Sequence, residues 1–143
     1  MKISFAAPAL PRSGSLVVGV LSGGDLLATA QRIDKASGGA LARAIGASRF
    51  NGESGQSLTL MAPAGVGAGR VVLMGLGEAG KFDDLAAQAF GGRAYKTVSG
   101  TGDKIATVAI DPVKGAKLKT AGISANAAYG ALLASYRFDK YRT

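Results

Sequence analysis

A glycine-rich loop that follows an apolar stretch contains residue types and spacings that could perform chemistry. It lies within residues 70–84, where Gly75, Gly77 and Gly80 match the dinucleotide-binding pattern G-x-G-x-x-G. Because Lys81 follows Gly80, the loop also matches most of the phosphate-loop pattern G-x-x-x-x-G-K-[ST]. Backbone amides in such loops bind phosphate groups. The first question is therefore whether this loop holds a phosphate.

The residues after Lys81 argue against a nucleoside triphosphate. The phosphate loop needs a Ser or Thr hydroxyl at this point to ligate Mg²⁺, and Phe82 offers no oxygen. Asp83 and Asp84 come next and place negative charge where the start of a helix would otherwise receive the anion. The two aspartates instead favour the positive N-terminal end of a helix. We therefore interpret the loop as a sharp turn from strand to helix.

The dinucleotide hypothesis fails for a different reason. Its fingerprint requires an acidic residue about 20 positions further on, at the end of the next strand. The nearest acidic residue at a predicted strand end is Asp111, about 30 positions past Gly80. A lone glycine pattern is also weak evidence in a chain with 22 glycines.

The composition restricts catalysis further. The 143 residues include no Cys and no His, which excludes disulfides, thiolate metal sites and every nucleophile activated by histidine. Of the nine carboxylates, only Asp83 and Asp84 are adjacent, and neighbours on a helix point in different directions. We therefore assign no catalytic, cofactor-binding or metal-binding residue to this chain.

The remaining composition is that of one globular domain covering residues 1–143, with 48% apolar and 18% charged residues. The apolar stretch at the N-terminus is too short for a signal peptide. No run approaches the roughly 18 apolar residues of a membrane span. We expect a cytoplasmic protein without a membrane partner.

Positive charge is concentrated toward the C-terminus. The net charge is +8, and residues 93–143 contain nine basic and three acidic side chains, a net charge of +6. Such an excess can bind phosphates or an acidic partner, with Lys114, Lys117 and Lys119 as candidates for contacts to a nucleic-acid backbone. We favour a solvated face, or a contact with something outside this chain, because no aromatic residues are interleaved with the basic ones.

Five strands are expected from apolar runs and alternation. About seven residues connect the third and fourth strands, which is too short for a parallel crossover and predicts an antiparallel hairpin. Together with helical connections elsewhere, this indicates an α/β fold with a mixed sheet flanked by helices. The expected strands are Lys2–Ala6, Ser15–Ser22, Gln56–Ala62, Arg70–Gly75 and Lys104–Ile110.

Four helical segments are expected. Asp25 is predicted to cap the first, and Gly46 to end a short second one. The third begins at Asp83, and the fourth at about Ser124. The residues expected to face the core are Leu26, Ala30 and Ile33 in the first, Leu41, Ala44 and Ile45 in the second, Leu85, Ala89 and Phe90 in the third, and Ala125, Ala128, Tyr129, Leu132 and Tyr136 in the fourth.

Three segments together carry a family resemblance. They are Phe50–Gln56 (FNGESGQ), Arg70–Gly77 (RVVLMGLG), and the end of the chain from Ala131 through the terminal SYRFDKYRT at 135–143. In this order and at these separations they resemble the N-terminal domain of the leucyl (cytosol) aminopeptidase family, over the whole chain.

The resemblance implies a macro-domain-like mixed sheet and a larger catalytic domain that is absent from this sequence. That domain would bind two divalent metal ions, zinc or manganese, and hydrolyse the N-terminal peptide bond of peptide substrates. The parent enzyme would be a homo-hexamer. No residue of this chain matches a ligand or catalytic position of the family, so none is carried over.

Three functions are therefore considered. The first is a non-catalytic domain that serves assembly, access to the active site or regulation of a metalloaminopeptidase, with the catalytic domain as its partner. The second is a basic nucleic-acid-binding module. The third is a domain that binds ADP-ribose or a related nucleotide where glycine loops meet the strand ends.

Overall fold

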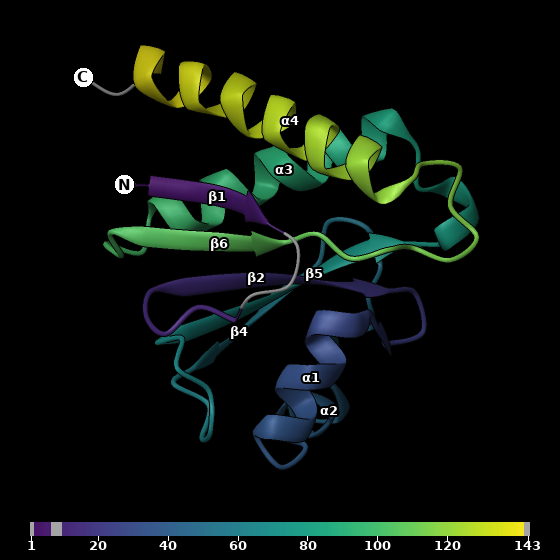
Figure 1. Cartoon of the computed structure of the whole chain (residues 1–143), viewed down its shortest axis with the longest axis vertical. Coiled ribbons are helices and arrows are strands. Elements are labelled where there is room, and N and C mark those ends of the chain that lie inside the picture. Colours follow the sequence, from purple (N-terminus) through teal and green to yellow (C-terminus); the bar gives the residue numbers. More distant parts are fainter. Residues whose placement is uncertain (1, 7–9, 142–143) are drawn as a thin grey trace.

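The protein is a mixed sheet with helices on both faces, as seen in a computed structural model that describes residues 2–6 and 10–141. The last two residues of the 135–143 segment lie outside this range. Helices α1 (Ala28–Ala36) and α2 (Ala40–Gly46) cover one face of the sheet. Helices α3 (Asp84–Ser99) and α4 (Thr120–Tyr141) lie on the other face, with α4 alongside α3 (Figure 1). The expectation of an α/β fold is confirmed.

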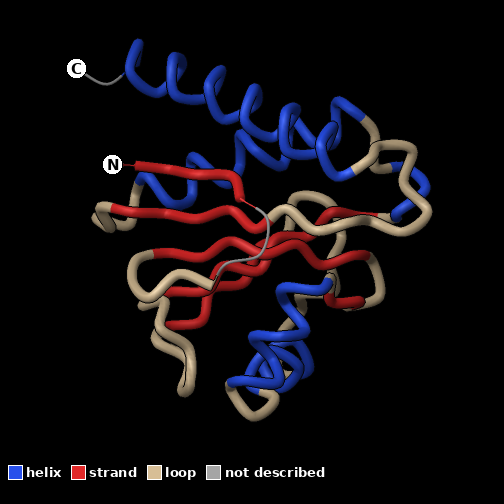
Figure 2. Tube along the Cα trace, in the orientation of Figure 1, coloured by secondary structure: helices blue, strands red, loops and turns tan. Residues whose placement is uncertain are grey.

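The sheet has the strand order β1-β6-β2-β5-β4, with the short β3 paired to β2 (Figure 2). Strands β1, β6, β2 and β5 are parallel to one another, while β4 is antiparallel to β5, which confirms the predicted hairpin. The strands are β1 (Lys2–Ala6), β2 (Ser15–Leu21), β3 (Asp25–Leu26), β4 (Ser57–Met61), β5 (Arg70–Gly77) and β6 (Ile105–Ala109).

Strand β3 corrects one prediction. Asp25 does not cap a helix but pairs with Leu21 in β3, and α1 begins later, at Ala28. The cause is the turn that precedes Asp25. Gly23 and Gly24 have positive φ angles of 87° and 80°, which glycine adopts without strain, and they fold the chain back onto β2 before the helix can start.

Two apolar clusters fill the layers. The central strands are buried on both sides, as covered parallel strands require. Val17 and Val72 point toward α3 and α4, whereas Leu16 and Val71 point toward α1 and α2. All four side chains are at most 1% exposed. This alternation sends successive residues of β2 and β5 to opposite cores.

Helices α3 and α4 approach so closely that glycine is required at the contact. A Cβ atom on Gly91 of α3 would lie 1.8 Å from the carbonyl oxygen of Ala127, and one on Gly130 of α4 would lie 1.9 Å from that of Gln88. Real Cβ atoms do not approach backbone this closely. The two glycines therefore fix the crossing of the helices, and the Gly91-Gly92 pair does not interrupt α3.

The predicted inward face is wrong for α4 and partly wrong for α3. The proposed stripe of α4 is wrong, because Ala125, Ala128, Tyr129, Leu132 and Tyr136 are all exposed. In α3, Phe90 is buried as expected, but Leu85 and Ala89 are exposed. Helix α4 also begins at Thr120, before the expected start. The side chains that face inward are Ala87, Phe90, Ala94 and Val98 of α3 and Ile123, Ala127, Ala131 and Ala134 of α4.

Substitution of Gly91 tests this contact. In a helix without tertiary contacts, Gly→Ala stabilises by up to about 1 kcal/mol. Here we expect Gly91→Ala to destabilise the chain by about 1–3 kcal/mol, because the methyl group meets the Ala127 carbonyl. The matched control is Gly92→Ala, whose Cβ would find nothing nearer than 3.4 Å. Urea unfolding measures both, and equal effects of the two substitutions would contradict the argument.

Candidate functional site

The glycine loop after β5 has its backbone donors occupied by the protein itself. The N–H of Gly75 donates to the carbonyl of Gln56 at 2.9 Å, and that of Gly77 donates to the carbonyl of Gly52, also at 2.9 Å. A Cβ on Gly75 would lie 2.0 Å from the carbonyl oxygen of Glu53. The 52–56 segment therefore occupies the space beside these glycines where a phosphate would otherwise approach.

The helix start after this loop is also occupied. The Asp83 carboxylate accepts a hydrogen bond from the N–H of Ala86 at 2.9 Å and caps α3, as the sequence predicts. Phe82 is 1% exposed and anchors the loop in the core. Lys81 pairs with Glu78 at 3.2 Å in an exposed contact. The stretch that matches nucleotide-binding patterns is thus held together by its own chain.

Asp111, the acidic residue at the end of β6, stabilises a helix. Its Oδ1 accepts hydrogen bonds from the N–H and the hydroxyl of Thr29, at 3.2 and 2.7 Å, at the first turn of α1. Within the described residues its Oδ2 atom has no partner. The adjoining cavity, also lined by Gly19 and Leu76, measures about 10 Å³. A cavity of this volume is about large enough for one water molecule and leaves no room for a nucleotide.

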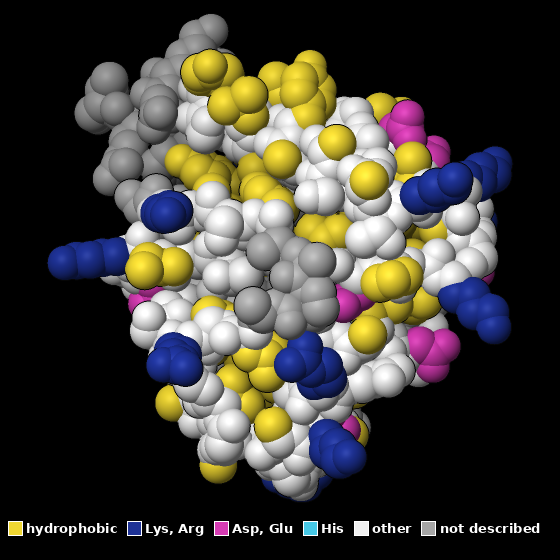
Figure 3. Space-filling model, viewed as in Figure 1, with side chains coloured by type: hydrophobic (Ala, Val, Ile, Leu, Met, Phe, Trp, Pro, Cys, Tyr) yellow, Lys and Arg dark blue, Asp and Glu magenta, His cyan; other side chains and the backbone are white. Residues whose placement is uncertain are grey.

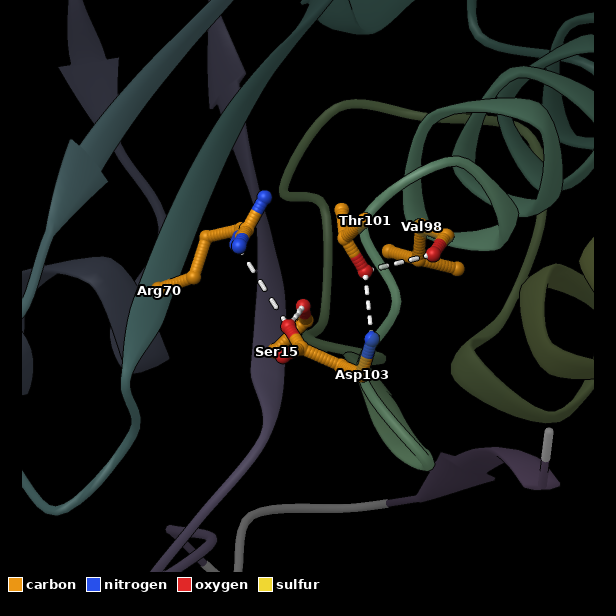
Figure 4. Close-up of polar contacts among 5 residues, drawn as sticks. All are labelled: Ser15, Arg70, Val98, Thr101 and Asp103. Carbon is orange, nitrogen blue, oxygen red and sulfur yellow. Dashed lines mark hydrogen bonds and ion pairs between the residues drawn. The ribbon is translucent and has the colours of Figure 1, made fainter.

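A polar network ties together the amino-terminal ends of three strands (Figure 4). The buried hydroxyl of Ser15 donates to Asp103 Oδ2, and Arg70 Nε forms an ion pair with the same oxygen at 3.4 Å. The N–H of Asp103 donates to Thr101 Oγ1 at 3.2 Å, and that hydroxyl donates to the carbonyl of Val98 at 2.7 Å. The network joins β2, β5 and the connection from α3 to β6.

No motif in the sequence predicts this network, but one signal could have indicated it. Ser15 and Arg70 are polar residues at the first positions of two apolar strands that pair in parallel, with these two residues in register. Parallel pairing brings the starts of both strands to the same edge of the sheet. An acidic residue in a neighbouring turn is then a natural partner, and Asp103 is that residue.

The candidate phosphate-contacting lysines lie in the connection between β6 and α4. Lys114, Lys117 and Lys119 are all exposed. This connection lies against the 3-10 turn η1 (Ala79–Lys81), because a Cβ on Gly115 would come within 3.6 Å of the Ala79 side chain. In Figure 3, basic side chains are spread over the edges and the lower part of the visible face, with acidic side chains among them.

The large apolar side chains of α3 and α4 form an uncovered face. Hydrophobic side chains gather over α4 in Figure 3. The sequence from Thr120 to Tyr136 contains no charged residue, which is unusual for the outer side of a surface helix. We define the uncovered face by its five members, with their exposed fractions: Leu85 (73%), Tyr129 (51%), Leu132 (50%), Leu133 (37%) and Tyr136 (65%).

A groove of about 360 Å³ runs along this face between the two helices. Its apolar lining includes Leu85 and Ala89 of α3 and Leu133 of α4, and its charged lining is Arg93 and Lys96. The same two cations line a second pocket of about 140 Å³ beside β4, together with Gln56, Ser57, Met74 and Thr97. Arg93 and Lys96 therefore line both the groove and the second pocket.

Two kinds of feature, a cluster of metal ligands and a membrane-spanning helix, are absent from the part of the chain that the structure describes. Across residues 2–6 and 10–141, no three acidic, histidine or cysteine side chains are grouped as metal ligands would be. In that same portion, no helix has both the length and the apolar character that crossing a membrane requires.

Comparison with protein families gives one match to this chain. A family described as "Cytosol aminopeptidase family, N-terminal domain" matches residues 17–143. A "Probable cytosol aminopeptidase" of Caulobacter vibrioides is 39% identical over 145 residues, and one of Rhodopseudomonas palustris is 34% identical over 143 residues. Both alignments cover 100% of this chain but 28% of the relative, so the chain spans little more than a quarter of these proteins.

The fold also resembles that of solved structures. A tomato leucine aminopeptidase mutant superposes with a TM-score of 0.69 at 22% sequence identity. The superposition covers 94% of this chain and 28% of the tomato chain. The bottromycin maturation enzyme BotP matches with a TM-score of 0.55 at 23% identity. At these identities the likeness concerns the fold.

Removal of Asp103 tests the polar network at the strand ends. We expect Asp103→Ala to lower the free energy of unfolding by about 1–3 kcal/mol, because the buried Ser15 hydroxyl loses its acceptor and Arg70 loses its ion-pair partner. The control is Glu78→Ala, which breaks an ion pair whose side chains are 62% and 82% exposed and should change stability by less than about 0.5 kcal/mol. Urea unfolding of both variants decides, and a similar small loss for Asp103→Ala would refute a stabilising role.

The uncovered face should contribute little to the stability of residues 1–143 alone. We expect Leu132→Ser and Tyr136→Ser each to change the free energy of unfolding by no more than about 0.5 kcal/mol, and together to reduce binding of a hydrophobic dye. Ile123→Ser, at a buried position of the same helix, should cost about 2–5 kcal/mol. Dye fluorescence and urea unfolding measure these effects, and a large loss from Leu132→Ser would mean that the face is already packed.

Proposed function

Because this chain belongs to the cytosol aminopeptidase family and corresponds to its N-terminal domain, we propose that it is a non-catalytic domain of a metal-dependent aminopeptidase. The family is one of hydrolases that act on peptides. The relatives are far longer than this chain, which covers 28% of each. On this proposal, hydrolysis takes place in a second domain that holds two divalent ions, zinc or manganese, and the full-length enzyme is a cytoplasmic homo-hexamer.

The uncovered face is the observation from which we infer what the domain does. Leu85 of α3 and Tyr129, Leu132, Leu133 and Tyr136 of α4 stay in contact with water in the isolated domain. Burying a leucine-sized side chain stabilises by roughly 1.5–3 kcal/mol. A face with several such residues and no charge on α4 from Thr120 to Tyr136 is typical of an interaction surface. We infer that it packs against the catalytic domain and holds that domain in its active assembly.

A covalent connection makes such a contact effective even over a modest area. Two domains on one polypeptide meet at effective concentrations in the millimolar range, so the entropy lost on association is smaller than for separate molecules. Helix α4 carries most of the face. A contact through α4 would therefore couple the position of this domain to that of the catalytic domain.

Two comparisons of activity test the proposal. Residues 1–143 should not hydrolyse leucine p-nitroanilide after addition of Zn²⁺ or Mn²⁺, whereas the full-length polypeptide should. In the full-length polypeptide, Leu132→Asp should lower activity at least about tenfold and shift the mass measured by light scattering below that of a hexamer, since a charge at the contact costs several kcal/mol.

The control for Leu132→Asp is Met61→Asp. Met61 of β4 is 64% exposed and does not belong to the uncovered face, so this substitution should leave activity and mass unchanged. Metal-dependent hydrolysis by residues 1–143 alone would overturn the assignment of chemistry to another domain. Unchanged activity and mass for Leu132→Asp would overturn the role of the face.

A further inference from the structure

Arg93 is a half-buried cation whose charge is not balanced within the described structure. Some other cations have partners: Arg70 pairs with Asp103, Lys81 pairs with Glu78, and Arg43 donates to the carbonyl of Gly38. Within residues 2–6 and 10–141, neither Arg93 nor Lys96 forms an ion pair. Burial lowers the pKa of the Arg93 guanidinium, yet arginine stays charged near neutral pH. Its desolvation is therefore uncompensated.

Among the side chains that the structure describes, no carboxylate pairs with Arg93. In α3 the acidic residue is Asp84, at the first position of the helix, and nine residues of rise place it about 13 Å along the axis from Arg93. The charged residues of α4 all come after Tyr136. Strands β4 and β5 contain no acidic residue, and Glu53, in the loop that lines the neighbouring pocket, is exposed. Arg93 therefore has no counter-charge among the described side chains.

The surroundings of Arg93 indicate which side chains a partner needs in addition to a negative charge. On one side lies the groove with Leu85, Ala89 and Leu133, and on the other lies the second pocket, which the hydroxyl-bearing Ser57 and Thr97 help to line. Leu133 belongs both to the groove and to the uncovered face, so the groove is continuous with that face. A complementary segment needs apolar side chains next to a carboxylate, which a guanidinium binds with two parallel hydrogen bonds.

We propose that the groove between α3 and α4 is the docking site for a segment of the catalytic domain of the same polypeptide in which a carboxylate lies next to apolar side chains. A carboxylate of that segment pairs with Arg93 and Lys96, and its apolar side chains fill the groove beside Leu133. The inference rests on the proposed function and adds the chemistry of the partner. A free anion such as phosphate satisfies the two cations but leaves Leu85 and Leu133 in water, so a protein segment fits the site better.

A photo-crosslinker at Leu133 identifies the occupant of the groove. Benzoylphenylalanine replaces Leu133 in the full-length polypeptide, and mass spectrometry locates the crosslinked residue after irradiation. We expect crosslinks to a catalytic-domain segment with an Asp or Glu within a few residues. The same probe at Met61, which is exposed on β4, should not reach that segment. Crosslinks to the N-terminal domain of a second copy, or to a segment without acidic residues, would overturn the proposal.

Substitution of Arg93 tests the charge pair, because it should not destabilise residues 1–143 alone but should weaken the contact in the full-length polypeptide. In residues 1–143, Arg93→Gln should raise the midpoint of thermal unfolding or leave it unchanged, because it removes an uncompensated, half-buried charge. In the full-length polypeptide the same substitution should lower the crosslink yield about tenfold or more, since it leaves the partner carboxylate unpaired. Arg12→Gln is the matched control at an exposed arginine and should change neither measurement.

The outcomes separate this inference from the proposed function. If Arg93→Gln leaves the crosslink yield unchanged while Leu132→Asp still reduces activity, the charge pair is wrong and the contact face stands. If neither substitution has an effect, both proposals fail. Inorganic phosphate provides a third test. If phosphate stabilises residues 1–143, Arg93→Gln abolishes that stabilisation, and Leu133 gives no crosslink, the site binds a free anion. That result would overturn the docking of a segment.

Discussion

The close approach of α3 and α4 at Gly91 and Gly130 determines the character of this domain. The close contacts of the backbone with a Cβ at either position permit only glycine and alanine where the two helices cross. The larger inward-facing side chains, Phe90 and Ile123, instead pack toward the sheet. Leu132 and Tyr136 of α4 take part in neither contact and stay exposed. The crossing and the apolar face are thus two sides of one helix pair.

The sequence predicted those features that follow from local rules. Apolar runs indicated all five long strands, the short link before β5 required an antiparallel hairpin, and Asp83 caps α3 as its type and position suggest. Prediction from the sequence failed where tertiary contacts override the periodic spacing of apolar residues. The large apolar residues of α4 predict a core-facing stripe, because such residues usually point inward. They lie outside because α4 contacts Gly91 of α3 through its own backbone at Ala127. Asp25 was misassigned because the turn at Gly23 and Gly24 adds a strand that no apolar pattern announces.

The loop after β5 shows why a glycine pattern needs geometry before it can be assigned a ligand. Gly75 is required because the carbonyl of Glu53 lies where its Cβ would be, and Gly77 has a positive φ of 77°. Their amides bond to Gln56 and Gly52. The segment 52–56 thus plays the part that a phosphate plays in a nucleotide-binding loop. Sequence alone cannot distinguish these cases, because both demand glycine for the same close approach of polar groups to the backbone.

The placement of charge separates interaction surface from solvated surface more sharply than net charge does. The excess of basic residues in the last third of the chain includes Lys114, Lys117 and Lys119, which are exposed in a connection and are hydrated as they stand. Arg93 belongs to the same third but is desolvated at the edge of an apolar groove. A solvated lysine gains little from a partner, because water already satisfies it. A desolvated arginine without a counter-charge gains much more, and its position beside Leu133 links that gain to burial of the apolar face. Charge and apolar area then favour the same partner at the same place.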